Sequence, residues 1–583
     1  MTVIPTLSRH PGEAAAPARA GSPPARLPRT PRQRGRDACA VPLLAALVAA
    51  FGVALASPVR LEVPPAGRVV LLPIDDRPAV AQFAQMIGAI ADCEVVIPPP
   101  PMLGRFTRPG DTAALQQWLR RQDYSKVDAL VVSVDMLAYG GLIASRTHKV
   151  TTERALDSLE FFRWFKREHP GIPVYAFSVL MRVAPTADAA SRSWGEDLAR
   201  WSELKDRAAR TADASLQAEL ERTERRLPPA VMEDYLAARK RDLAVNLAAI
   251  DLRSRKQIDT LILLQDDARL YGLHRLDQRV ISSRLKELGL ESEVPVYNGA
   301  DEGSLALVSR AVLVKSRAPV NVFAVYSSAR ARKVTAPFED RPLEFTVANQ
   351  LRGSGATPVD TEEASDYRLY VNAPETTEAE FEVFVDAMTR DMKSGRPVAL
   401  ADVLFPAPHH SGADQRVIRR LEEQDLFDRF TGYAAWNTAG NTLGTAIPHA
   451  NMRILAIRKF ASDPERAART LVAHLEFLLH RFAGDYLYHD VVRFEINGRL
   501  RKQAGADTNE FTPAVHGQVN AETVGKLRPL VMELFDRRFK GRDYGSVRIT
   551  GLRDLDIVLP WPRTFEVTIR YRMEYELRHG PRR

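Results

Sequence analysis

The chain has 583 residues, of which 45% are hydrophobic and 26% charged, so it is not a largely disordered protein. Its length exceeds the usual single-domain range, and two or three domains are expected. The formal net charge is +8, but seven arginines against two acids leave +5 within residues 1–37. The rest is nearly balanced and has no basic stripe interleaved with aromatics, so no nucleic-acid partner is expected.

The first predicted element is a secretory signal peptide. Residues 1–37 are rich in Arg, Pro and Ala, and an apolar run from Val41 to Ala56 follows them. The run ends in Ala54-Leu55-Ala56, a small-x-small pattern typical of a cleavage site. It is short for a membrane span, which needs about 20 apolar residues, although an uncleaved anchor is an alternative. We therefore expect residues 1–57 to be a leader cleaved near Ala56. The mature protein would be periplasmic or secreted, without a stable membrane span.

Short β-branched runs recur along the mature chain, each ending in polar residues and followed by helical periodicity. Near-continuous apolar strands separated by helices predict a parallel α/β fold whose sheet is covered on both faces. We expect a (β/α)8-barrel-like body, with an open sheet as the alternative. The ranges expected to form strands are 68–74, 94–97, 129–134, 173–179, 260–264, 295–298, 320–326, 367–372 and 397–403.

Two parts of the chain depart from this pattern. Residues 188–256 are charged and rich in Ala, Leu and Arg, and they predict a helical insertion. Towards the end of the chain, residues 547–572 alternate like strands. The expected organisation is therefore an α/β catalytic-type domain over residues 65–450 and a small C-terminal module of helices and strands over residues 451–583.

Acidic residues directly follow three of the predicted strands. In parallel α/β folds the carboxyl ends of the strands form the ligand site, whether the sheet closes or stays open. Two neighbouring carboxylates can divide acid and base work when their environments push the two pKa values apart. The alternative is that one carboxylate of each segment only caps the next helix. The candidates are Asp75, Asp76 and Arg77 after the first strand, Gln265, Asp266 and Asp267 after the fifth, and Asn298, Asp301 and Glu302 after the sixth.

Two further segments combine glycines with polar side chains. Asp135 ends the third predicted strand, and Gly140-Gly141 would let a ligand approach the backbone within reach of Arg146. The alternative is a glycine turn with Arg146 in solvent. Residues 432–445 contain two Asn, three Thr and several Gly, which are costly choices for a buried helix. They predict a loop that grips a polyhydroxylated ligand, or else a turn that packs a helix on a strand. The binding groups of the loop would be Trp436, Asn437 and Asn441.

No metal or cofactor site is expected. The sequence has no HExxH or CxxC spacing, and adjacent His409-His410 side chains rarely converge on one ion. The phosphate-loop spacing and the GxSxG elbow are also missing, so nucleotide binding and Ser-His-Asp hydrolysis have no support. Cys39 lies in the leader, and Cys93 is expected to be a buried core thiol.

Five ordered strings between residues 68 and 450 resemble a bacterial family known as a domain of unknown function, number 4127. The resemblance supports the domain limits and the choice of motifs, and it implies no activity. The order of an Asp-Asp pair and a later Trp-Asn segment is also similar to sugar-cleaving barrels that act on N-acetylhexosaminides. The five strings are Leu72 to Pro78, Gly140 to Arg146, Gln265 to Ala268 with Tyr271-Gly272, Asn298 to Glu302, and Trp436 to Gly444.

These features favour an exported, glycosidase-like hydrolase that acts on a carbohydrate or cell-envelope glycan. Glycoside cleavage needs one carboxyl group to protonate the leaving oxygen and one to stabilise or attack the anomeric centre. Asp266 and Asp267 are the expected pair, with Asp301 and Glu302 as the next catalytic candidates, and the other residues named above would bind substrate. Two alternatives stay open: a metal-dependent hydrolase that uses the same carboxylates, and a non-catalytic exported sugar-binding protein.

Overall fold

The computed structural model describes residues 64–405, 412–502 and 507–578, so the predicted signal peptide and the His409-His410 pair lie outside the described residues. The predicted parallel α/β fold is confirmed. The barrel is wrong, because the described residues form two open parallel sheets and a small antiparallel C-terminal sheet. A strand buried on both faces has the same apolar pattern in a barrel and in an open sheet, so periodicity could not distinguish them.

The first parallel sheet has the strand order β2-β1-β3-β4-β5-β6. The chain moves outward from β1 to β2 and then returns to the other side of β1 to form β3. Connections that diverge in this way open a crevice at the carboxyl ends of the strands, which is the usual ligand site of open α/β sheets. The strands are β1 (Gly67–Leu72), β2 (Cys93–Val96), β3 (Ala129–Ser133), β4 (Val174–Leu180), β5 (Thr260–Gln265) and β6 (Val296–Asn298).

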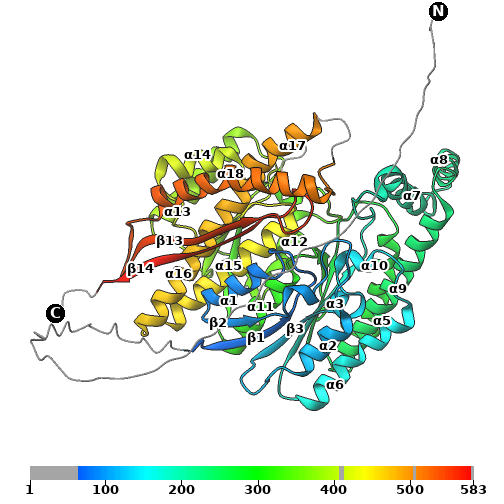
Figure 1. Cartoon of the computed structure of the whole chain (residues 1–583), viewed down its shortest axis with the longest axis horizontal. Coiled ribbons are helices and arrows are strands. Elements are labelled where there is room, and N and C mark those ends of the chain that lie inside the picture. Colours follow the sequence, from blue (N-terminus) through cyan, green and yellow to red (C-terminus); the bar gives the residue numbers. More distant parts are fainter. Residues whose placement is uncertain (1–63, 406–411, 503–506, 579–583) are drawn as a thin grey trace, which may run out of the picture. The chain divides into compact units, whose positions relative to one another are not determined.

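The outer face of this sheet is covered by helices that share one hydrophobic cluster with the strands. Figure 1 shows them in blue, cyan and green around β3. They are α2 (Thr112–Arg120), α3 (Val134–Tyr139), α5 (Thr152–Ser158), α6 (Glu160–Glu168), α9 (Pro229–Ser254) and α10 (His274–Glu287). The predicted helical insertion contains α7 (Gly195–Ala208), α8 (Ala214–Glu224) and α9, which bury a small cluster of their own around Trp201.

The second parallel sheet has the order β11-β10-β9-β7-β8. Its two edge strands were not predicted from the sequence. The strands are β7 (Val320–Tyr326), β8 (Ala356–Pro358), β9 (Tyr367–Asn372), β10 (Val398–Asp402) and β11 (Gly432–Ala434).

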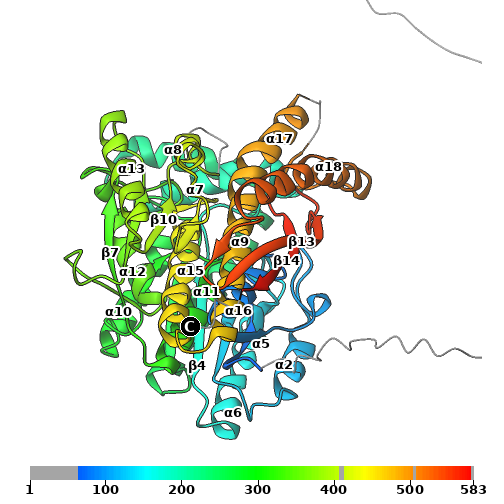
Figure 2. The same cartoon turned by 90° about the vertical axis from the view of Figure 1, so that its left-hand side faces the viewer.

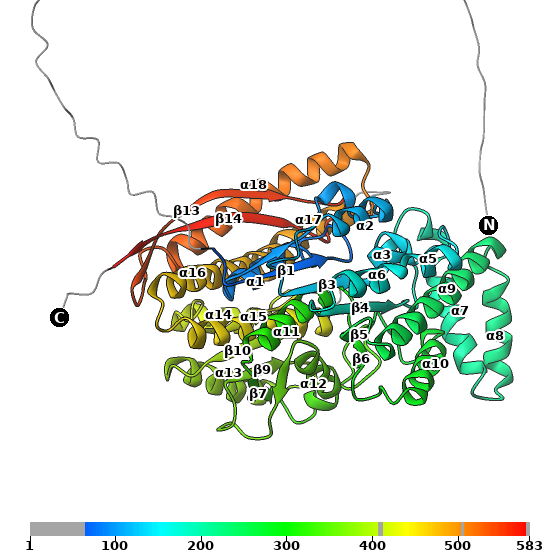
Figure 3. The ribbon, with the colours of Figure 1, turned by 90° about the horizontal axis from the view of Figure 1, so that it is seen from below.

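Four helices join the two parallel sheets through a shared hydrophobic cluster that includes strand residues of both. Figure 3 shows two of them, α11 and α15, near the middle of the structure. The four are α1 (Gln82–Ile90), α11 (Gly303–Ser316), α12 (Leu343–Gly353) and α15 (Ala439–Lys459). The predicted domain boundary at residue 450 falls inside α15. Cys93 is buried in this cluster, as expected.

The rest of the chain covers the far side of the second sheet and ends in the antiparallel sheet. Strand β13 contacts α18 and β14 contacts α16, and Figure 2 shows this hairpin in red. These elements are α13 (Glu378–Lys393), α14 (Gln415–Gln424), α16 (Pro464–Arg481), the π-helix η4 (Phe482–Val492), α17 (Arg493–Arg501), α18 (Pro513–Arg538), β12 (Asp543–Tyr544), β13 (Val547–Val558) and β14 (Thr568–Leu577). The remaining short helices are η1 (Pro100–Met102), α4 (Leu142–Ser145), η2 (Ser191–Ser193) and η3 (Ala331–Lys333). None of the helices described here has the length and apolarity to cross a membrane.

Candidate active site

A cavity of about 350 Å³ lies at the carboxyl ends of the first sheet's strands, a volume typical of small-molecule sites. Segments that follow β1, β3, β4, β5 and β6 all contribute to its wall. Four segments from outside that sheet complete it, at Phe338-Glu339, residues 437–441, Asn509 and residues 561–565. The nine predicted site residues that line it are Arg77, Arg146, Gln265, Asp266, Asp267, Asn298, Asp301, Asn437 and Asn441.

Arg77 ties the end of β1 to the end of β6. Its guanidinium lies 2.7 Å from Asp75 and 2.6 Å from Asp301, and all three side chains are buried. Burial raises the pKa of the Asp301 carboxyl, while the positive charge of Arg77 opposes the change. Asp75 does not line the cavity, since it is turned towards Arg77 as its counter-ion. Asp75 therefore acts on the site through Arg77, and Asp301 faces it directly.

Asp266 and Asp267 each pair with a separate arginine. Arg146 donates to Asp266 at 2.6 Å, and the other oxygen of Asp266 accepts the backbone N–H of Asp267 at 2.9 Å. Burial would raise the pKa of Asp266, but Arg146 and then Arg182 outweigh it and lower that pKa. The pKa of Asp267 is raised by burial, which the pairing with Arg182 at 2.6 Å only partly offsets. The two carboxyl groups thus differ in acidity.

Asp267 is the more accessible of the two carboxylates. Its side chain is 26% exposed, against 7% for Asp266, and the closest approach of Arg182 is to its Oδ2. No hydrogen bond to its Oδ1 comes from a residue that the structure describes. Asp267 therefore keeps one carboxylate oxygen for a ligand, whereas both oxygens of Asp266 already accept hydrogen bonds.

Glu339 is a cavity residue that the sequence analysis missed. It lies between η3 and α12 and follows no strand, so the strand-end rule could not find it. The backbone N–H of Ala268 donates to Phe338 O at 2.7 Å, which holds the Glu339 segment beside the Asp266-Asp267 loop. Its Oε2 accepts the Thr346 hydroxyl at 2.6 Å, whereas its Oε1 is buried without a hydrogen bond of good geometry from the described residues.

Burial favours the protonated form of the Glu339 carboxyl. Burial raises its pKa from 4.5 to about 8, and the hydrogen bond from Thr346 only partly opposes this. A protonated carboxyl is a hydrogen-bond donor as well as an acceptor. The cavity thus contains one proton donor, Glu339, beside a carboxylate that arginines keep ionised, Asp266.

Asn298 presents an unsatisfied amide at the end of β6. The residue is 2% exposed, yet neither its Oδ1 nor its Nδ2 has a hydrogen-bond partner among the described residues. A buried amide without partners is unfavourable, so this amide points to a ligand that supplies the missing hydrogen bonds. The following Gly299 has φ +152°, and a Cβ there would lie 1.8 Å from Glu302 Oε1. Glycine is therefore required at this strand end.

Glu302 lies behind the cavity wall and does not line it. It is 1% exposed, and it accepts hydrogen bonds from Gln350 and Asn441, both at 2.9 Å. Burial raises its pKa to about 7. Its contacts hold Asn441 in place, so the structure assigns it a positioning role. The catalytic role predicted for Glu302 has no direct contact with the cavity to support it.

The segment 432–445 is a strand and the start of a buried helix, so the predicted gripping loop is wrong for most of it. Thr438 caps α15 by accepting the N–H of Asn441, and Thr442 and Thr445 donate their hydroxyls to backbone carbonyls. Gly444 is required because a Cβ there would lie 2.2 Å from Glu302 Cγ. The glycines and threonines thus make a tightly packed helix possible, and only residues 437–441 reach the cavity.

Three other predicted side chains are also directed away from the cavity. Trp436 donates to Thr445 at 3.1 Å and packs edge-on against Phe83 in the core. Asp135 accepts the backbone N–H of Val179 at 3.0 Å, and Asp76 accepts the indole N–H of Trp561 at 2.6 Å. None of the three lines the cavity.

The glycine pair after β3 also serves the fold. Gly140 has φ +85°, and a Cβ there would lie 2.5 Å from the carbonyl oxygen of Gly110. Gly140 therefore packs against protein backbone, and neither it nor Gly141 lines the cavity.

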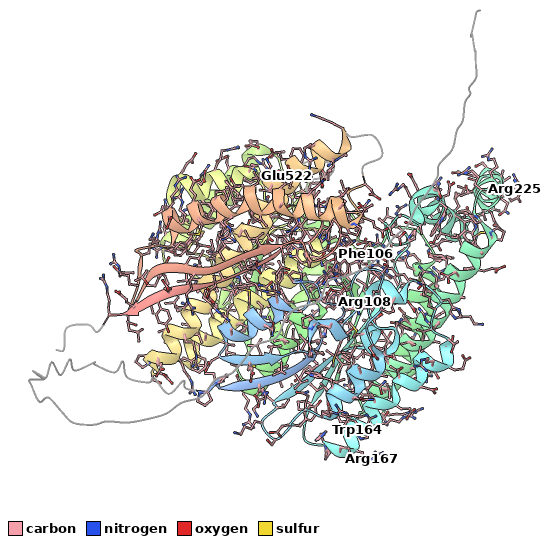
Figure 4. The ribbon with its side chains drawn as sticks, viewed as in Figure 1. Phe106, Arg108, Trp164, Arg167, Arg225 and Glu522 are labelled. Carbon is pink, nitrogen blue, oxygen red and sulfur yellow. The ribbon has the colours of Figure 1, made fainter. Side chains whose placement is uncertain are left out.

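The aromatic wall of the cavity comes from the C-terminal segment. Trp561 packs against Phe106, labelled in Figure 4, with ring centroids 5.7 Å apart, and Arg563 lies 4.7 Å from the Trp561 centroid. Arg77 stacks on the same indole at 5.0 Å. Other cavity residues that the sequence analysis missed are Arg182, Thr186, Phe338, Asn509 and Phe565.

Over residues 64–405, 412–502 and 507–578, no group of three or more His, Cys, Asp or Glu side chains is arranged to hold a metal ion. The carboxylates at the cavity have arginine partners instead: Asp266 pairs with Arg146, Asp267 with Arg182, and Asp301 with Arg77.

Comparison with known proteins gives one result of substance. A sequence model of the family described as "Protein of unknown function (DUF4127)" matches residues 69–570, which is most of the chain. The chain belongs to this family. The match includes both parallel sheets, the cavity and most of the C-terminal hairpin. A search of curated proteins finds no match.

Proposed function

We propose that this protein of the DUF4127 family is an exported hydrolase that cleaves a glycosidic bond in a carbohydrate or cell-envelope glycan. The observation that carries the proposal is that one cavity is lined both by Glu339, a buried carboxyl whose pKa is raised, and by carboxylates paired with arginine. Acid–base hydrolysis requires two carboxyl groups whose environments push their pKa values apart. The signal-peptide pattern of residues 1–57 supports export.

In the proposed reaction Glu339 gives its proton to the leaving glycosidic oxygen. Asp267, with its accessible Oδ1, stabilises or attacks the anomeric centre, or activates the water that does so. Asp266 stays ionised and fixes Arg146, while Asn298 binds a hydroxyl or acetamido group. The proposal keeps Asp267 as a catalytic candidate and replaces its predicted partner by Glu339.

The test measures the hydrolysis of glycosides that differ only in their leaving group, by the wild type and by the variants Glu339→Gln and Asp267→Asn. Each sugar, N-acetylhexosaminides included, is offered as an alkyl glycoside and as a dinitrophenyl glycoside, whose leaving group needs no proton. We expect Glu339→Gln to lose about 10²–10⁴-fold on the alkyl glycoside and far less on the dinitrophenyl one, because only the first needs general-acid help. Asp267→Asn should lose activity on both. The control is Asp157→Asn, an exposed carboxylate on α5, which should match the wild type.

Three outcomes would contradict the proposal. Equal loss on both leaving groups in Glu339→Gln would remove the general-acid role. Activity abolished by a chelator and restored by a divalent ion would favour metal-dependent hydrolysis. Binding without turnover on every sugar would favour a sugar-binding protein.

A further inference from the structure

A second cavity of about 370 Å³ adjoins the polar one. The two share three wall residues, Ile143, Arg146 and Thr186. Arg146 donates one amino group to Asp266 at 2.6 Å and the other to Thr186 at 3.0 Å, so its guanidinium forms part of the boundary between the cavities. A ligand that fills the polar cavity therefore lies next to the second one.

The second cavity differs from the first in chemistry. Its buried wall is formed by Tyr139, Leu198 and Tyr235, and the partly buried Ile143 and Trp194 extend it. Among the residues that line it, the exposed ones include polar Thr107, Lys149 and Asp234. An apolar interior with a few polar groups at its edge is the usual composition of a site for an apolar group.

The inserted helices supply the far wall of this cavity. Trp194 precedes α7, Leu198 lies on α7, and Val231 and Tyr235 lie on α9. The Tyr235 hydroxyl donates to Val183 O at 3.0 Å, which fixes α9 to the loop after β4. On the near side, the buried Arg241 donates to the carbonyls of Thr147 at 2.9 Å and Val150 at 3.1 Å. Both walls are therefore held in place by buried hydrogen bonds.

We propose that the substrate is amphiphilic, with a hydroxylated sugar in the polar cavity and a covalently attached alkyl or aryl group in the apolar one. The assignment of a sugar to the polar cavity rests on the proposed function, whereas the assignment of an apolar group to the second cavity does not. Each methylene that leaves water for an apolar site is worth roughly fourfold in affinity. The helical insertion thus acts as the specificity element for the apolar part of the substrate.

The experiment measures calorimetric binding of hydrolysis-resistant ethyl, butyl and octyl 1-thio-N-acetylglucosaminides to the full protein. We expect the octyl compound to bind at least about tenfold more tightly than the ethyl compound. Ala230→Trp and Val231→Asp should remove this gain while ethyl binding changes less than about twofold, since both residues line only the apolar cavity. Glu233→Trp, an exposed change on the same helix that lines neither cavity, should keep the gain.

Equal affinity for all chain lengths, or a gain that persists in both cavity variants, would overturn the inference. Failure of the proposed function gives a different result, because octan-1-ol probes the apolar cavity without a sugar. Octanol binding that is lost in Ala230→Trp but kept in Glu233→Trp supports the apolar subsite even if no glycoside is hydrolysed. The apolar subsite is refuted if the wild type does not bind octan-1-ol and its affinity for the thioglycosides does not depend on chain length.

Discussion

Replacing Glu339 with glutamine tests whether this carboxyl holds a proton in the folded protein at neutral pH. Glutamine keeps the shape and the hydrogen bond with Thr346 but has no proton to lose. In the wild type the folded-state pKa is raised from 4.5 to about 8. The unfolded chain therefore loses this proton near pH 4.5 and the folded chain only near pH 8. Unfolding releases a proton between these values, so wild-type stability falls as pH rises through this window.

The magnitude follows from the pKa difference. A difference of about 3.5 at about 1.4 kcal/mol per pKa unit gives at most about 5 kcal/mol, of which roughly 3 kcal/mol falls between pH 5 and pH 8. Glu339→Gln escapes this loss, so its stability relative to the wild type should rise by about that amount from pH 5 to pH 8. The same proton serves catalysis in the proposed mechanism, so wild-type activity on alkyl glycosides should fall above about pH 8.

The assay is urea unfolding of both proteins at four pH values from about 5 to about 8, followed by circular dichroism. The control is Glu233→Gln, an exposed glutamate, whose stability difference from the wild type should not vary with pH. The infrared band of a protonated carboxyl at neutral pH should also weaken in Glu339→Gln alone. A stability difference that stays constant across the range would show that Glu339 is ionised when folded, and the general-acid assignment would be refuted.

Gly444→Ala should lower stability by about 1–3 kcal/mol or more in denaturant titrations, because its Cβ would lie 2.2 Å from Glu302 Cγ; an unchanged midpoint would contradict the tight packing of α15. Asn298→Ala should weaken substrate binding without lowering stability, because its amide makes no hydrogen bond in the described protein; a stability loss above about 1 kcal/mol would argue for a structural role. Arg182→Gln should raise the pKa of Asp267 further, because the arginine charge is lost, and should move the acidic limb of the pH–rate profile to higher pH. If that limb does not move, Asp267 is not a catalytic group.

Much of the site could be predicted because strand ends are a local property of the sequence. The apolar run before Asp266 and Asp267 marks a buried parallel strand, and such strands bring their carboxyl ends together in any α/β fold. The same rule found Arg77, Asn298 and Asp301. The loop predicted over residues 432–445 was wrong for a different reason. Gly and Thr are poor helix formers on their own, so the sequence did not indicate the helix that forms there. Here the helix is stabilised by packing against Glu302, for which glycine is needed.

The sequence by itself determined the parallel α/β class and the carboxylate clusters, since both depend on patterns within about ten residues of one another. Only the tertiary structure decided that the strands form two open sheets, because the hydrophobic period of a strand does not depend on which other strands it pairs with. It also brought Trp561 to Asp76, which lies 485 residues earlier in the chain, and Glu339 to the Asp266-Asp267 loop. Burial then set which carboxyl keeps its proton, and burial is a property of the folded chain alone.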